Sequence, residues 1–308
     1  MPEPEQPAER PVPAPEKDAA VREENAAVSR ADGSGQDAEA PHPWTRQVSL
    51  GDSFTEGIGD PSEGGGHRGW ADRVAEVLAE SQPDFAYANL AVRGRLLDQI
   101  RDEQVASALE LRPDLITLCA GGNDVIRPGG DPDVIAAKLD AVVAILATSG
   151  ATILLFTGPD IGGTPVLGSV RGRVAVFNEH IRGIAARHDA VVGDLWNLHE
   201  LKDKSMWDAD RLHFSPLGHQ TIAAMALDAL QVPHRLSPET VEPVPATSWR
   251  EARADDIRWA REHFVPWVVR RLRNESSGDG VLPKRPTPAP MFGGSMPMGS
   301  HEGEVGKR

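Results

Sequence analysis

The sequence predicts an α/β protein with a mostly parallel sheet, and two patterns in the central part of the chain support this. Short apolar runs alternate with longer segments in which apolar residues recur at helical spacing, as in successive βαβ units. The runs are apolar at most positions, which is typical of strands buried on both faces of a parallel sheet. One large domain is therefore expected between the two ends of the chain.

The expected elements alternate strictly. In chain order they are a strand at 47–50, a helix at 70–79, a strand at 85–90, a helix at 97–111, a strand at 115–120, a helix at 132–147, a strand at 152–157, a helix at 170–188, a strand at 190–194 and a helix at 216–229. Pro132 and Pro216 suit a first helical turn, and Gly150 suits a helix end. Because the carboxyl ends of parallel strands meet at one edge of the sheet, the functional site is expected there.

The ends of the chain differ from its centre in composition. Residues 1–44 are rich in Pro, Glu and Ala with almost no large apolar residue, so they are expected to be disordered. Residues 274–308 repeat Pro, Gly, Ser and Met without periodicity and are expected to form a second disordered tail. The methionines of this tail could alternatively form an interaction motif. Neither tail is expected to carry chemistry.

Residues 45–232 are expected to form the main domain, followed by a linker and a helix at 233–273 that packs on it. Apolar residues such as Trp249 and Trp267 recur at helical spacing, although Pro266 should kink or end the helix. The alternative is a helix that binds a membrane surface or a partner. Its acidic first half favours packing on the domain, because an anionic membrane would repel it.

Composition and charge exclude several classes of function. The formal net charge of -14 argues against non-specific binding to nucleic acid. No apolar stretch reaches the roughly 20 residues of a membrane span, and the first residues do not resemble a secretory signal, so a cytoplasmic location is expected. No metal-binding or phosphate-loop pattern occurs, so metal and nucleotide chemistry are not expected. The single cysteine, Cys119, is expected to be a buried, inert thiol in the core.

Short segments that follow expected strands, or precede the last expected helix, contain residues suited to acyl transfer. They are GDSFTEG at 51–57, NLAVRG at 89–94, GGND at 121–124 and DADRLHFSPLGH at 208–219. Each alone has a structural explanation, because Ser53 could cap a helix, Asn123 could satisfy loop backbone groups and Gly94 could permit a turn. Together they supply every group that ester hydrolysis requires.

A serine nucleophile needs a base within hydrogen-bond reach, and His213 can be that base for Ser53. Asp210 lies three residues before His213, close enough for one tight turn to direct its carboxylate to the imidazole, with Asp208 as the nearest rival. The tetrahedral intermediate also needs hydrogen-bond donors for its oxyanion. The candidate donors are the backbone N–H groups of Ser53 and Gly94 and the side-chain amide of Asn123.

With these four blocks in this order, the chain resembles the SGNH hydrolase family, also called the GDSL esterases and lipases. The resemblance implies a flavodoxin-like three-layer α/β/α sandwich without metal or organic cofactor. It also implies a catalytic triad of Ser53, His213 and Asp210, and an oxyanion hole formed by Ser53, Gly94 and Asn123. The family motif usually has Leu where this chain has Phe54, which leaves the serine unaffected.

The expected function is a serine hydrolase that cleaves a small-molecule carboxylic ester. The alternatives are a carbohydrate O-deacetylase of the same family and a catalytically silent binding module. Among nearby residues, His219 is expected to make a structural contact and Asp124 to support its loop, whereas His67 is a candidate substrate contact.

Overall fold

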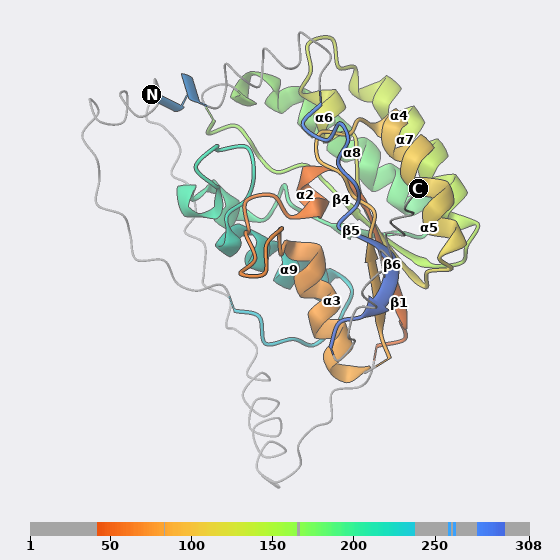
Figure 1. Ribbon diagram of the computed structural model, residues 1–308. Helices are drawn as coiled ribbons and strands as arrows, with labels where there is room; N and C mark the ends of the chain where they lie inside the picture. Colours follow the sequence, from red (N-terminus) through yellow and green to blue (C-terminus); the bar gives the residue numbers. More distant parts are fainter. Residues whose placement is uncertain are drawn as a thin grey trace, which may run out of the picture. The chain divides into compact units, whose positions relative to one another are not determined.

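The computed structural model describes residues 42–82, 84–164, 167–237, 258–259, 261–262 and 276–292. Within these residues, six strands form a sheet in the order β5-β4-β3-β1-β2-β6 (Figure 1). The strands are β1 (Arg46–Gly51), β2 (Ala86–Asn89), β3 (Leu115–Cys119), β4 (Thr152–Phe156), β5 (Val191–Gly193) and β6 (Arg285–Pro290). β1 to β5 pair in parallel, and β6 pairs antiparallel with β2.

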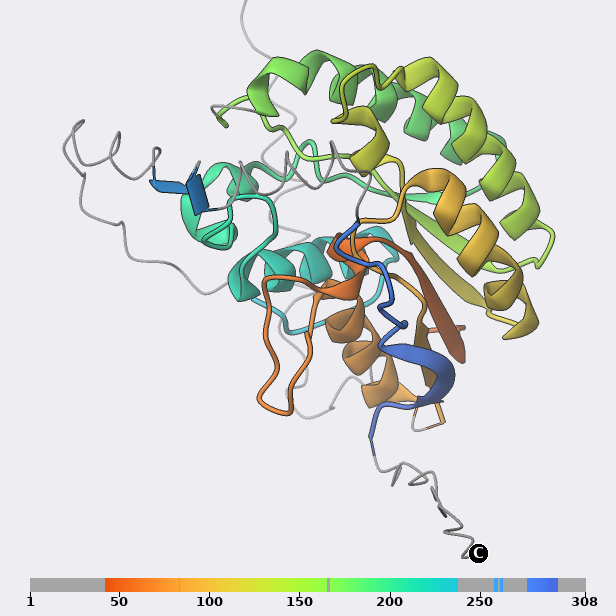
Figure 2. The same cartoon turned by 45° about the horizontal axis from the view of Figure 1, so that its top comes forward.

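Helices cover both faces of the sheet. The main ones are α3 (Trp70–Ser81), α4 (Leu97–Ile100), α5 (Ala106–Glu110), α7 (Pro132–Ala147), α8 (Arg171–Arg187) and α9 (Pro216–Ala229). One face packs on α4, α5, α7 and α8 around Val48 and Ile116, and the other packs on α3 and α9 around Trp70 and Leu154 (Figures 1 and 2). The expected flavodoxin-like α/β/α sandwich is therefore confirmed.

The helix starts follow from capping residues in the sequence. Asp131 caps α7 by accepting a hydrogen bond from the backbone N–H of Asp133, and Ser215 caps α9 by accepting one from Gly218. The expected helix at 97–111 is built from α4, a π-helical segment (Arg101–Val105) and α5. The short α2 (Ser53–Glu56) and α6 (Gly122–Val125) were not expected, because four residues are too few to show a periodic pattern.

The expectation of a disordered tail at 274–308 is wrong for residues 276–292, which include β6. Proline occupies every second position of this strand, at Pro286, Pro288 and Pro290. Proline cannot donate to a ladder, so the segment does not look like a strand in the sequence. At the edge of a sheet, however, only alternate N–H groups face the neighbouring strand, and β6 pairs Ala289 with Tyr87 of β2.

The other domain boundaries lie partly within the described residues. His42 and Trp44 are both 7% exposed, and Trp44 Nε1 donates to Thr152 Oγ1 at 3.0 Å, so the domain begins before residue 45. Residues 1–41, expected to be a tail, lie outside the described part, as does most of the expected linker and helix at 233–273. Among the described residues, no helix is long and apolar enough to cross a membrane.

Candidate active site

The turn that carries Ser53 lies between β1 and α2. Gly51 has φ +150°, and a Cβ atom there would lie 2.6 Å from a carbonyl oxygen of β3, so the position favours glycine. Gln104 fixes the same residue, because its Oε1 accepts from Gly51 N and its Nε2 donates to Gly51 O, both at 2.9 Å. Asp52 caps α2 by accepting from Phe54 N. Ser53 is therefore not the helix cap.

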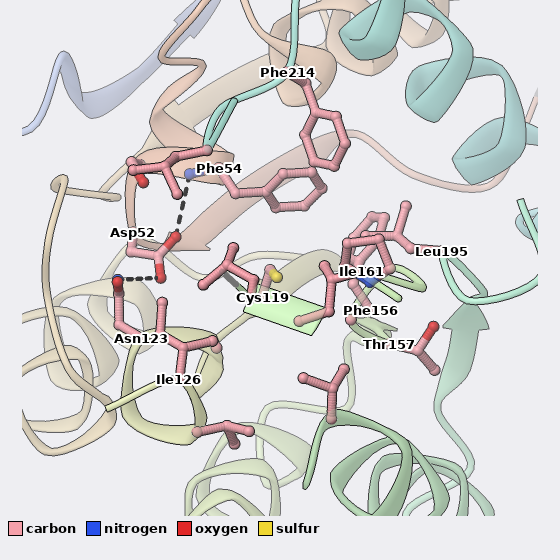
Figure 3. A pocket seen from close by; sticks show the side chains of 18 of the residues that line it. Asp52, Phe54, Cys119, Asn123, Ile126, Phe156, Thr157, Ile161, Leu195 and Phe214 are labelled. Carbon is pink, nitrogen blue, oxygen red and sulfur yellow. Dashed lines mark hydrogen bonds between the residues drawn. The ribbon is translucent and has the colours of Figure 1, made fainter. Parts of the chain in front are cut away.

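Asp52 links this turn to Asn123 on α6. It is 7% exposed and accepts hydrogen bonds from Phe54 N at 3.1 Å and from Asn123 Nδ2 at 2.8 Å (Figure 3). Burial raises the pKa of Asp52 to about 6, although these hydrogen bonds oppose the rise. Asn123 Nδ2 also donates to Arg95 O at 3.2 Å. The amide is thus held between the Ser53 turn and the loop that follows β2.

The loop after β2 is joined to α2 by two further contacts. Asn89 is buried and donates from Nδ2 to Thr55 O at 2.8 Å. The Glu56 carboxylate accepts from Arg93 N at 2.7 Å and forms an ion pair with the Arg93 guanidinium. Gly94 follows directly with φ +74°, in the left-handed region. These contacts fix the position of the Gly94 loop relative to Ser53.

The loop at 207–215, which precedes α9 and is called the acid–base loop below, brings Asp210 and His213 together. Asp210 Oδ2 lies 2.6 Å from His213 Nδ1, and Oδ1 accepts from the backbone N–H groups of Leu212 and His213 at 2.9 Å. Burial alone would raise the pKa of Asp210, but the hydrogen bonds from His213 and Leu212 lower it to about 2. The rival, Asp208, contributes a backbone N–H to His213 O at 2.8 Å. Asp210 therefore holds the imidazole of His213 through Nδ1.

A cavity of about 180 Å³ lies between the Ser53 turn, α6 and the loop that carries His213 (Figure 3). Ser53, Asn123 and His213 line it, but Gly94 does not. The other lining residues are mostly apolar and include Phe54, Cys119, Ile126, Phe156, Ile161, Val174, Phe177, Ile181, Leu195 and Phe214. Within the described residues, Ser53 Oγ makes no hydrogen bond to His213, and the backbone N–H groups of Ser53 and Gly94 have no acceptor. The structure thus brings Ser53, Asn123 and His213, the candidates for nucleophile, oxyanion donor and base, to one cavity.

Two neighbouring polar residues have structural roles. His219 is fully buried, and its Nδ1 accepts from Trp70 N at 3.2 Å while its Nε2 lies 3.0 Å from Ile58 O. Burial lowers the pKa of His219 to about 4. Asp124 accepts from Leu97 N at 3.0 Å and thereby joins α6 to the start of α4. The expected structural contact of His219 is confirmed.

His67, Cys119 and Trp207 differ in their relation to the cavity. His67 does not line it, so the structure gives no support for a substrate contact there. Cys119 is half-buried and lines the cavity, which corrects the expectation of a core position, and burial raises the pKa of its thiol well above the ordinary value. Trp207 lines the cavity, and its Nε1 donates to Leu201 O at 2.7 Å.

The contacts that join the blocks are the part of the site that sequence analysis missed. Gln104 and the pair formed by Glu56 and Arg93 come from separate blocks or helices, so no local spacing indicates them. The opposite charges of Glu56 and Arg93 are visible in the sequence and are the only signal of their pairing. Trp259 and Lys284, which lie outside all four blocks, also contact this region.

A three-layer fold in which a serine turn, an amide and an Asp–His pair surround the carboxyl edge of the sheet defines the class of SGNH-type esterases. The chain belongs to the GDSL-like lipase/acylhydrolase family, whose model matches residues 49–221. Its activity is therefore that of an esterase or acylhydrolase. No curated protein matches the chain.

Several solved structures share the fold. A catalytic mutant of Axe2, an acetylxylan esterase from Geobacillus stearothermophilus, is 19% identical with a TM-score of 0.52, over 64% of this chain and 100% of that chain. TesA is 20% identical with a TM-score of 0.51, over 60% of this chain and 98% of that chain. LAE5, an alpha/beta hydrolase enzyme from the metagenome of Lake Arreo in Spain, is 22% identical with a TM-score of 0.50, over 61% of this chain and 95% of that chain. At these identities the likeness concerns the fold alone.

Proposed function

We propose that the protein hydrolyses carboxylic esters through an acyl-enzyme on Ser53. His213 Nε2 accepts the Ser53 proton while Oγ bonds to the ester carbon, and it then donates that proton to the departing alcohol. Water attacks the acyl-enzyme by the same route and releases the acid. The observation that carries this proposal is the 2.6 Å contact between Asp210 and His213 beside a cavity that Ser53 also lines.

In this proposal the developing oxyanion receives hydrogen bonds from Ser53 N, Gly94 N and Asn123 Nδ2. Among the described residues, these two backbone groups have no acceptor that the oxyanion would have to replace. Among the described residues, Asn123 Nδ2 donates to Asp52 and to Arg95 O, and Arg95 O at 3.2 Å is the more distant. The oxyanion would replace Arg95 O, while Asp52 continues to orient the amide.

The acyl group would occupy the apolar cavity. The lining of the 180 Å³ cavity is mostly apolar, so it suits an acyl chain longer than acetyl. Each buried methylene contributes about 0.8 kcal/mol, or about a fourfold gain in kcat/KM. Esters of acids longer than acetic acid are therefore the expected preferred substrates.

Carbohydrate O-deacetylation is the second candidate, and one observation favours it. A larger cavity of about 970 Å³ adjoins the acid–base loop, and its lining includes Trp207, Asp208 and Arg211 together with Asp160 and Arg171. An aromatic face with charged groups around it suits a sugar as the alcohol part of the substrate. In that case an acetyl group would leave most of the apolar cavity unfilled.

A substrate panel separates these functions. Purified protein is assayed with p-nitrophenyl esters from acetyl to dodecanoyl and with acetylated xylo-oligosaccharides, and Ser53→Ala serves as the control. The proposal predicts that kcat/KM rises as the acyl chain lengthens beyond acetyl and levels off once the cavity is filled. A maximum at acetyl, with release of acetate from the sugars, would favour the deacetylase. Absence of turnover and of fluorophosphonate labelling at Ser53 would favour a silent binding module.

A further inference from the structure

The segment 276–292, which lies outside the residues matched by the family model, touches the proposed catalytic turn directly. Lys284 stands just before β6, and its Nζ donates to Glu56 O at 2.6 Å and to His67 O at 3.0 Å. It also forms an ion pair with the carboxylate of Asp72 on α3. The side chain of Lys284 is 21% exposed and that of Asp72 is 14% exposed. Lys284 thus joins the end of α2, the helix that begins at Ser53, to the loop that contains His67 and to α3.

The start of the same segment packs on the Gly94 loop. A Cβ atom on Gly94 would lie 2.5 Å from Ser276 Oγ, and one on Gly278 would lie 2.1 Å from Arg93 O, so the two backbones are in contact. Asp279 Oδ2 accepts from Ser276 N at 2.9 Å and closes this turn. Segment 276–292 therefore lies against the Gly94 loop through Ser276 and contacts the Ser53 turn through Lys284 (Figure 2).

The Glu56–Arg93 pair connects these two points. Lys284 binds the backbone oxygen of Glu56, and the Glu56 side chain binds Arg93, the residue directly before Gly94. A continuous path of hydrogen bonds therefore runs from segment 276–292 through α2 to the Gly94 loop. Displacement of Lys284 would change the position of Ser53 relative to Gly94.

We propose that residues 276–292 form an internal strap that positions the Ser53 turn and the Gly94 loop relative to each other, with Lys284 as its positioning residue. The proposal rests on the proposed function for its catalytic consequence. Strand β6 anchors the strap by pairing with β2, and Arg285 strengthens the anchor by donating from Nε to Tyr87 O at 2.8 Å. Because β6 is fixed to the sheet, the side chain of Lys284 is held at the Ser53 turn.

The test replaces Lys284 in the full-length protein. Lys284→Met keeps the length of the side chain and removes its donors, while Lys284→Arg keeps the charge. Lys138→Met is the matched control, because Lys138 forms an exposed ion pair with Asp98 on the surface. The double variant Lys284→Met/Asp72→Asn removes the buried charge that Lys284→Met would leave unpaired, which spares folding.

Two readouts distinguish the strap from the proposed function. Hydrogen–deuterium exchange of the amides at 51–57 and 91–96 should be faster in Lys284→Met and in the double variant, without a change in α7. With a soluble ester, kcat should fall about 10- to 100-fold in both variants, since small displacements of reacting groups are costly. Lys284→Arg should recover part of this loss, and Lys138→Met should match the wild type in both readouts.

The possible failures are separable. Unchanged exchange in the Lys284 variants would overturn the strap, whatever the wild-type activity. Faster exchange with unchanged kcat in an active enzyme would also overturn it, because the turn would then move without consequence for catalysis. Faster local exchange in a wild-type protein that hydrolyses no ester would refute the proposed function and leave the positioning contact supported.

Discussion

Asp52→Asn tests the electrostatics of the buried carboxyl beside Ser53. The pKa of Asp52 rises from the ordinary value of 3.8 to about 6 on folding, because the group is buried. Between these values the folded protein binds more protons than the unfolded chain, so the free energy of unfolding falls as the pH rises. The contribution of Asp52 is fully present below pH 3.8 and is lost as the pH passes about 6. At 1.36 kcal/mol per pH unit, it amounts to about 3 kcal/mol.

The asparagine variant cannot titrate, so it lacks this dependence. Its amide also meets two donors, Phe54 N and Asn123 Nδ2, and one of them loses its acceptor at a cost of about 1–3 kcal/mol. That cost is the same at every pH. The stability of the variant relative to the wild type should therefore rise by about 3 kcal/mol from pH 3.8 to pH 8.

Urea denaturation across this pH range measures the difference directly. Glu80→Gln, at the exposed end of α3, is the control for a carboxylate at the surface, because Glu80 forms no ion pair within the described residues. A stability difference between Asp52→Asn and the wild type that does not change with pH would refute the reasoning. The same variant should also hydrolyse esters more slowly, because its single side-chain oxygen cannot hold both Phe54 N and Asn123 Nδ2 as the two oxygens of Asp52 do.

Three further substitutions test the proposed roles. Ser53→Ala should abolish ester hydrolysis and fluorophosphonate labelling with an unchanged melting temperature, and Ser53→Ala/His213→Ala should be no worse than either single variant; additive losses in kcat would contradict this coupling. Asn123→Ala should lower kcat by about 10²- to 10³-fold with little change in KM. It should also lower the melting temperature, because Asp52 loses a donor. A near-normal kcat with a lower melting temperature would remove Asn123 from the proposed oxyanion hole. Trp259→Phe removes the indole N–H that donates to Asp210 O at 2.6 Å but keeps a ring beside Arg211. The loss of one hydrogen bond of about 1 kcal/mol should lower kcat about fivefold. An unchanged kcat would show that this contact does not support the acid–base loop.

The sequence predicts most of the fold because the buried strands and amphipathic helices carry local periodic signals. It also predicts the pairing of Asp210 with His213, since a spacing of three residues and one tight turn are local features. It does not distinguish Ser53 from Asp52 as the helix cap, because both residue types serve that role and only the backbone geometry decides.

The contacts that the sequence does not predict join distant segments. Lys284 lies 228 residues from Glu56, and a surface lysine in a proline-rich segment resembles a solvated tail. Cys119 lies in an apolar run that predicts a core position, but the strand ends there and its side chain faces the cavity. Such features depend on where elements end and meet, which a periodic pattern does not specify.

The proline pattern of β6 has a consequence for self-association. An exposed sheet edge offers unpaired N–H groups to strands of other molecules, and without β6 the edge would be β2. Half of the residues of β6 are prolines, which have no N–H to offer, and the opposite edge of the described sheet, β5, is only three residues long. The chain therefore covers β2 with a strand that has few backbone donors for another strand, which opposes edge-to-edge aggregation.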